Sequence, residues 1–226
     1  MKIVKTPRGL KMVEGDAVLS ELLAEPGPTH CLFDVLAACV EALAPGPRVG
    51  LLGFAGGGIM APLRAMGFPD AIEAVDLDPT GEALFRALSG SWAREVRVAR
   101  MDALAWLARE QPFDVIVEDL SVTGDAGTVK PEVSFGALPA LVKSRLRPEG
   151  VAVTNLLPQP GASWDSLIAP VARIHDRACV LELAEHENRI VVAGAIPDTA
   201  DLSKRVLTSL YRIGSVQARK VRVVAL

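Results

Sequence analysis

Residues 49–58 read VGLLGFAGGG, and this stretch decides the fold. Its first half is a short apolar run without charges, which is typical of a strand buried in a parallel sheet. Its second half is a glycine-rich turn, which lets the backbone approach a ligand closely. A helix that starts after such a turn points free N–H groups at the same place. The stretch therefore predicts the first strand, turn and helix of a nucleotide-binding sheet.

On both sides of this stretch, short apolar runs alternate with helix-like segments. Strands are predicted at residues 48–53, 71–76, 96–100, 113–118 and 151–155, and helices at residues 57–66, 80–88, 103–109, 133–146 and 163–175. Residues 179–184 and 189–195 flank a polar turn and predict an antiparallel closing hairpin. The alternation predicts an α/β fold with a doubly wound, mostly parallel, seven-stranded Rossmann-like sheet.

The length of 226 residues suits one domain. We expect residues 47–196 to form the Rossmann-like core, residues 1–46 a hairpin and helix extension, and residues 197–226 a helix and a strand. The terminal stretch KVRVVAL has the composition of a strand edge that could pair with a second chain, which makes a homodimer possible.

Composition excludes several classes of function. A net charge of -3 and an aromatic content of 4% argue against a nucleic-acid-binding surface. The uncharged run at residues 49–63 is too short for a membrane span and is broken by glycines and Pro62. The first residues lack a secretory signal, and three cysteines without a Cys-x-x-Cys pair suit reduced thiols. We therefore expect a cytoplasmic protein without a membrane segment, and the three scattered histidines predict no metal site.

Acidic residues follow three of the predicted strands. Asp76 ends the second strand about twenty residues after the glycine turn, where a carboxylate can accept hydrogen bonds from both hydroxyls of a ribose. Asp102 follows the third strand and could accept from an adenine amine, and Asp119 ends the fourth. Two alternatives stay open. Gly56-x-Gly58-x-x-Ala61 can be fitted to a dinucleotide fingerprint, and the turn could serve helix–sheet packing alone.

Five pieces of the chain, in order and spacing, resemble the class I S-adenosylmethionine-dependent transferases, and within them spermidine synthase-like proteins. The pieces lie at residues 49–58 (VGLLGFAGGG), 74–79 (AVDLDP), 101–103 (MDA), 113–120 (FDVIVEDL) and 146–156 (LRPEGVAVTNL). The resemblance implies S-adenosylmethionine or decarboxylated S-adenosylmethionine as the cofactor. It also implies that Asp119 is catalytic and faces the attacking nucleophile. The cofactor-binding residues that it implies are Gly53, Phe54, Ala55, Gly57, Asp76, Leu77, Asp102 and Ala103.

The chain departs from the spermidine synthase pattern at two acidic positions. Val122 replaces the second carboxylate of an Asp-Ser-Ser-Asp pattern, and Gly56 stands where those enzymes usually carry an aspartate. Both losses disfavour a polycationic polyamine as the substrate. The expected function is transfer of an alkyl group, methyl or aminopropyl, to an unidentified nucleophile of a small molecule, with an amine among the candidates. The alternatives are an NAD-dependent oxidoreductase and an inactive pseudo-enzyme or interaction module on the same fold.

The residues around Asp119 raise two further hypotheses. Residues 121–131, with Asp125 and Lys130 among them, are long and polar enough to form a substrate gate, although a solvated linker is the alternative. Because side chains alternate along a strand, Glu118 should project to the face opposite Asp119.

Overall fold

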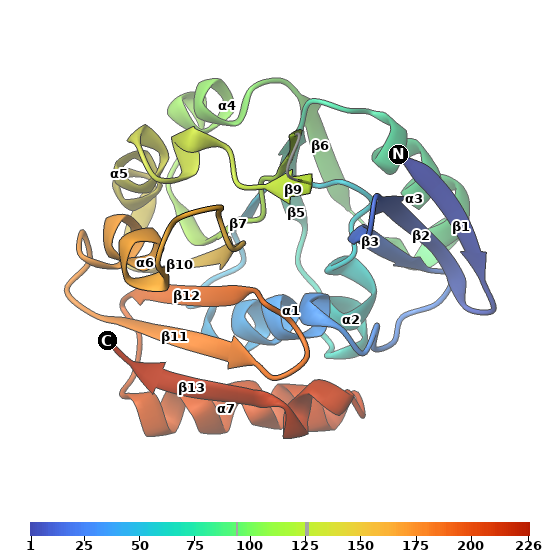
Figure 1. Ribbon diagram of the computed structural model, residues 1–226. Coiled ribbons are helices and arrows are strands. Elements are labelled where there is room, and N and C mark those ends of the chain that lie inside the picture. Colours follow the sequence, from blue (N-terminus) through green and yellow to red (C-terminus); the bar gives the residue numbers. More distant parts are fainter. Residues whose placement is uncertain (94, 125–126) are drawn as a thin grey trace.

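An eight-stranded sheet forms the centre of the protein (Figure 1). The structure is a computed structural model, and it describes residues 1–93, 95–124 and 127–226. The strand order of the sheet is β13-β11-β12-β10-β7-β4-β5-β6. The strands are β4 (Val49–Leu52), β5 (Ile72–Asp76), β6 (Val96–Arg100), β7 (Phe113–Glu118), β10 (Leu146–Leu156), β11 (Ala178–Leu183), β12 (Arg189–Gly194) and β13 (Val221–Ala225). From β10 to β6 the neighbours run parallel, whereas β11, β12 and β13 pair antiparallel. The predicted doubly wound sheet with its closing hairpin is therefore confirmed.

The prediction of seven strands was wrong by one strand. The C-terminal strand β13 pairs antiparallel with β11 of the same chain, from Cys179 opposite Ala225 to Leu183 opposite Val221. It thereby adds an eighth strand at one edge of the sheet. The pairing gives this apolar segment a partner within its own chain, and the homodimer stays a prediction.

Helices cover both faces of the sheet. They are α1 (Leu32–Leu43), α2 (Met60–Ala65), α3 (Thr80–Ser89), α4 (Ala103–Arg109), α5 (Ala137–Ser144), α6 (Trp164–Ala172) and α7 (Thr199–Arg212), with short 3-10 helices at Gly90–Ala93, Glu132–Ser134 and Val216–Arg219. Val115 and Val117 of β7 pack with α1 and α2, whereas Ile116 packs with α4 and α5, as the alternation of a strand requires. In Figure 1, α4 and α5 accordingly lie across the sheet from α1 and α2. None of the described helices is long and apolar enough to cross a lipid bilayer.

Two helices are shorter than the sequence predicts. The helix expected at residues 57–66 starts only at Met60, because Gly57 stays in the turn with a φ of 67°. The helix expected at residues 133–146 is divided into a 3-10 turn, Glu132–Ser134, and α5, with Gly136 in a non-helical conformation between them.

The first residues form a separate three-stranded antiparallel sheet. Its strands are β1 (Lys2–Thr6), β2 (Gly9–Glu14) and β3 (Ala17–Leu23), which follow one another as a meander. The turn around Gly15 was expected, whereas β1 was not. Met12 and Leu22 of this meander are buried in the same core cluster as α1 and α2. The meander is therefore packed against the main body through apolar contacts.

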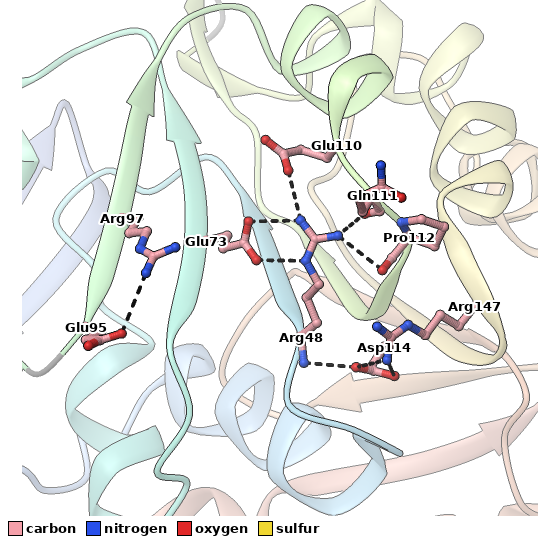
Figure 2. A network of polar contacts seen from close by, with 9 residues as sticks. All are labelled: Arg48, Glu73, Glu95, Arg97, Glu110, Gln111, Pro112, Asp114 and Arg147. Carbon is pink, nitrogen blue, oxygen red and sulfur yellow. Dashed lines mark hydrogen bonds and ion pairs between the residues drawn. The ribbon is translucent and has the colours of Figure 1, made fainter.

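A network of charged side chains lies at the amino ends of the parallel strands (Figure 2). Arg48, just before β4, donates to Glu73 of β5 at 2.8 Å and to Glu110 at 2.9 Å. Arg147 pairs with the buried Asp114 of β7 at 3.0 Å. Together with the hydrogen bond from the Arg48 N–H to Asp114 at 2.9 Å, these contacts join the four neighbouring strands β10, β7, β4 and β5 at one end of the sheet. The candidate site lies at the other end.

Candidate functional site

A pocket of about 340 Å³ opens at the carboxyl ends of the parallel strands, where open α/β sheets bind their ligands. The glycine turn, the ends of β5, β6 and β7, and the N-terminal meander all contribute to its wall. Of the sequence-predicted site residues, it brings together Gly53, Ala55, Asp76, Leu77, Asp102, Ala103 and Asp119.

The glycine turn is shaped by two close backbone approaches. Gly53 has a φ of 86°, and a Cβ there would lie 2.7 Å from the carbonyl oxygen of Asp119. Gly81, at the start of α3, is closer still, because a Cβ there would lie 1.6 Å from the carbonyl oxygen of Ala55. Only glycine fits at these two positions, so the turn is held between β7 and α3.

Two predicted cofactor contacts, Phe54 and Gly57, do not line this pocket. The Phe54 ring is buried and packs edge-on against Phe85, with the ring centroids 5.4 Å apart. Gly57 makes room for that ring, since a Cβ there would lie 2.6 Å from Phe54 Cζ. Their role in the structure is therefore packing beneath the turn, which the sequence pattern did not distinguish from ligand contact.

Asp76 is fixed at the edge of the pocket by the backbone on both sides of it. The N–H of Ala55 donates to Oδ2 at 2.7 Å, and the N–H of Asp78 donates to Oδ1 at 2.9 Å. Each carboxylate oxygen can accept a second hydrogen bond, so the group can receive two neighbouring hydroxyls. The exposed side chain of Leu77 lies next to it on the rim.

Asp102 caps the helix that follows β6. Its Oδ1 accepts from the N–H of Ala105 at 2.9 Å, which accounts for its place in the sequence without any ligand. It also lines the pocket, with Ala103 beside it and Met101 on its other side. A helix cap and a hydrogen-bond acceptor for a bound group are compatible, because the second carboxylate oxygen is not used by the cap.

Asp119 has the most perturbed carboxylate in the pocket. Burial raises its pKa to about 6, against the lowering effects of the Lys130 ammonium and of a hydrogen bond from Asn155. Asn155 donates to Oδ1 at 2.7 Å and accepts in turn from Asn188 Nδ2 at 2.9 Å. Such a carboxylate is ionised at neutral pH and has a pKa close enough to that pH to exchange a proton.

The two asparagines behind Asp119 were missed by sequence reasoning. Asn155 stands near the end of the apolar strand β10, and Asn188 stands in the turn of the closing hairpin. A single polar residue that ends a buried β-branched run is the signal that could have identified Asn155. Asn188 carries no such signal, because polar residues are ordinary in hairpin turns.

Glu118 projects to the opposite face, as the alternation predicts. Its Oε1 accepts from Lys130 Nζ at 2.6 Å and from Ser134 Oγ at 3.2 Å. The side chains of Lys130 and Glu118 are only 1% and 3% exposed. The C-terminal end of residues 121–131 is therefore buried and held by this ion pair. This contradicts the alternative prediction of a fully solvated linker.

Thr123, within residues 121–131, contacts the meander. This segment contains a short hairpin of β8 (Val122–Gly124) and β9 (Gly127–Val129), and Asp125 lies outside the described residues. The Thr123 hydroxyl donates to Glu14 of β2 at 2.8 Å. This contact joins the hairpin to the meander beside the pocket; the gate itself stays a prediction.

The space beside Gly56 is apolar. A Cβ on Gly56 would lie 2.5 Å from Leu22 Cδ1 and 2.7 Å from Met12 Sδ, both from the meander. No aspartate fits there unless these side chains move. In the described part of the chain, no three His, Cys, Asp or Glu side chains are grouped so that they could hold a metal ion.

Comparison with solved structures places this architecture among known folds. Human methyltransferase-like protein 13 in complex with SAH (S-adenosylhomocysteine) is 23% identical, with a TM-score of 0.62 over 84% of this chain and 91% of that one. A probable spermidine synthase from Corynebacterium glutamicum is 14% identical, with a TM-score of 0.74 over 99% and 86%. A spermidine synthase in complex with the transition state analogue AdoDATO is 13% identical, with a TM-score of 0.61 over 77% and 64%. Neither a protein-family model nor a curated protein sequence matched the chain.

The chain thus has the class I methyltransferase fold. Spermidine synthases are among the solved structures that share this fold.

Proposed function

We propose that the protein is a transferase that binds S-adenosylmethionine or its decarboxylated form and transfers an alkyl group, methyl or aminopropyl, to a small-molecule nucleophile. The observation that carries this proposal is the Asp76 carboxylate, held by two backbone N–H groups at the edge of the pocket. There it can accept both hydroxyls of a ribose. Structures of this fold with SAH and with AdoDATO add support, since each holds an adenosyl ligand.

The other pocket residues suit the remaining parts of such a ligand. Asp102 can accept from an adenine amine at the end of β6, and the Gly53–Ala55 backbone can approach the sulfur side. When bound, the adenosylsulfonium supplies an alkyl carbon that the positive sulfur has already activated. The residues of the chain then have to align the nucleophile and accept its proton. The raised pKa of Asp119, about 6, suits this carboxylate to accept that proton.

A binding titration tests this proposal against the oxidoreductase alternative. We expect calorimetry to show micromolar binding of SAH and no binding of NADH. Asp76→Asn should weaken SAH by about tenfold or more, because a hydrogen bond to a charged group is replaced by a weaker one. Asp176→Asn, at an exposed acid away from the pocket, should bind SAH like the unchanged protein. Binding of NADH instead of SAH, or equal SAH affinity of both variants, would overturn the proposal.

A variant of Asp119 separates catalysis from cofactor binding, when both SAH affinity and alkyl transfer are measured. Asp119→Asn keeps an oxygen that can accept from Asn155, so SAH affinity should stay within about threefold while transfer is lost. If instead no variant of Asp119 changes cellular function, the pseudo-enzyme alternative is supported and the transferase is not.

A further inference from the structure

The acceptor end of the pocket, beyond Asp119, has apolar walls. Met12 and Leu19 line the pocket from the meander, and Leu120 and Val122 line it from the segment that follows β7. The hydrogen bond between Thr123 and Glu14 joins these two segments outside the pocket. A molecule that reaches Asp119 from this side therefore meets mostly aliphatic and thioether groups, with the Ser121 side chain also on this wall.

Charge is distributed unevenly along the pocket. Asp76, Asp78 and Asp102 lie at the ends of β5 and β6, which is the adenosyl side in the proposed function. Asp119 is the carboxylate at the end of β7. Within the described ranges, no lysine, arginine or histidine lines the pocket. Met1 also lines the pocket, and its N-terminal ammonium pairs with Glu14 at 3.4 Å. Because Glu14 is already paired, Asp119 is the carboxylate that can pair with a positive charge at the acceptor end.

A second positive charge on the acceptor would find no unpaired carboxylate among the described residues at this end, since Glu14 pairs with the Met1 ammonium. Val122 presents a hydrocarbon side chain, and the space beside Gly56 is filled by Leu22 and Met12. An ammonium group pressed against these side chains would lose its hydration without gaining a partner. This lack of a second unpaired anion disfavours a diamine as the acceptor.

We propose that the acceptor is a monoamine with an apolar body, bound with its nitrogen at Asp119; this inference rests on the proposed function. The amine arrives as an ammonium ion, pairs with the Asp119 carboxylate and gives it one proton. The nitrogen lone pair then forms a bond to the alkyl carbon, and the carbon–sulfur bond breaks with its electron pair going to sulfur. The sulfonium becomes a neutral thioether, and the product nitrogen carries the transferred group.

The test uses three probes with the same six-carbon chain. Protein saturated with SAH is titrated by calorimetry with hexylamine, 1,6-diaminohexane and 1-hexanol. Hexylamine should bind at least about tenfold more tightly than either of the others, because the diamine buries an unpaired charge and the alcohol carries none. Val122 is suited to substitution, since its side chain is 46% exposed. Val122→Asp should strengthen diaminohexane binding by about tenfold, whereas Val122→Asn, similar in size and uncharged, should leave it unchanged.

Each result has one meaning. Equal binding of hexylamine and diaminohexane to SAH-loaded protein would overturn the monoamine inference and leave the proposed function standing. Equal binding of hexylamine and hexanol would also overturn the monoamine inference. Equal effects of Val122→Asp and Val122→Asn on diaminohexane binding would overturn it as well. Failure of SAH itself to bind would overturn the proposed function and the inference together.

Discussion

Removal of the Lys130 ammonium should be among the most damaging single changes in this protein. Lys130 and Glu118 are almost fully buried, with Nζ and Oε1 2.6 Å apart. In Lys130→Met, Glu118 keeps hydrogen bonds from the Leu120 N–H at 3.0 Å and the Ser134 hydroxyl at 3.2 Å, but loses its counter-ion. A buried carboxylate left without its partner costs about 3–5 kcal/mol. That loss is a large part of the roughly 5–15 kcal/mol by which a domain is stable.

Urea unfolding of matched variants checks this magnitude. Lys130→Met should lower the free energy of unfolding by about 3–5 kcal/mol, and the double change Glu118→Gln with Lys130→Met should recover most of it, because an amide leaves no charge unpaired. Lys220→Met removes a partly exposed lysine from its pair with the exposed Glu185 and should cost less than about 1 kcal/mol. A loss below about 1 kcal/mol in Lys130→Met, or a double variant no more stable than the single one, would refute the reasoning.

Three further predictions follow from the site. The raised pKa of Asp119 means that the folded state holds its proton to about pH 6, whereas the unfolded state releases it near 3.8, so stability falls as pH rises between these values. Asp119→Asn should therefore be more stable than the unchanged protein in urea at about pH 8, and this advantage should shrink at about pH 4.5. Gly81→Ala should lower SAH affinity at least about tenfold by calorimetry, since its Cβ would force the Ala55 carbonyl out of the turn; unchanged affinity would contradict this geometry. Gly56→Asp should lower the free energy of unfolding by roughly 1–3 kcal/mol through overpacking against Leu22, and by a further amount through burial of a charge. The midpoint of thermal unfolding should fall accordingly, and an unchanged midpoint would show that the meander moves aside easily.

The main sheet could be predicted because its signals are local. Buried runs such as residues 113–118 identify strands, and a glycine turn followed by Asp76 identifies the edge where a pocket forms. What could not be predicted depends on contacts between distant segments. β13 has the same strand-like composition whether it pairs with β11 or with another chain, and nothing near Lys130 in the sequence indicates that it is buried against Glu118.

The contacts of individual side chains could not be predicted from the sequence either. The pattern that placed Phe54 in the ligand turn does not contain Phe85, against which its ring packs. Likewise, the hydrogen bond from Asn155 to Asp119 joins two strands that are neighbours in space and far apart in sequence. Periodicity assigns a face to a residue, and the partner on that face has to come from the structure.

The origin of the pocket walls has an evolutionary consequence. Asp76 and Asp102 belong to the sheet, whereas Met12 and Leu19 belong to a meander formed by the first 23 residues. Among the described residues, the meander forms no strand pairs with the eight-stranded sheet, so its sequence can change without disturbing the hydrogen-bonded register of that sheet. Relatives of this protein can therefore differ in the meander side of the pocket while the side formed by the sheet stays the same.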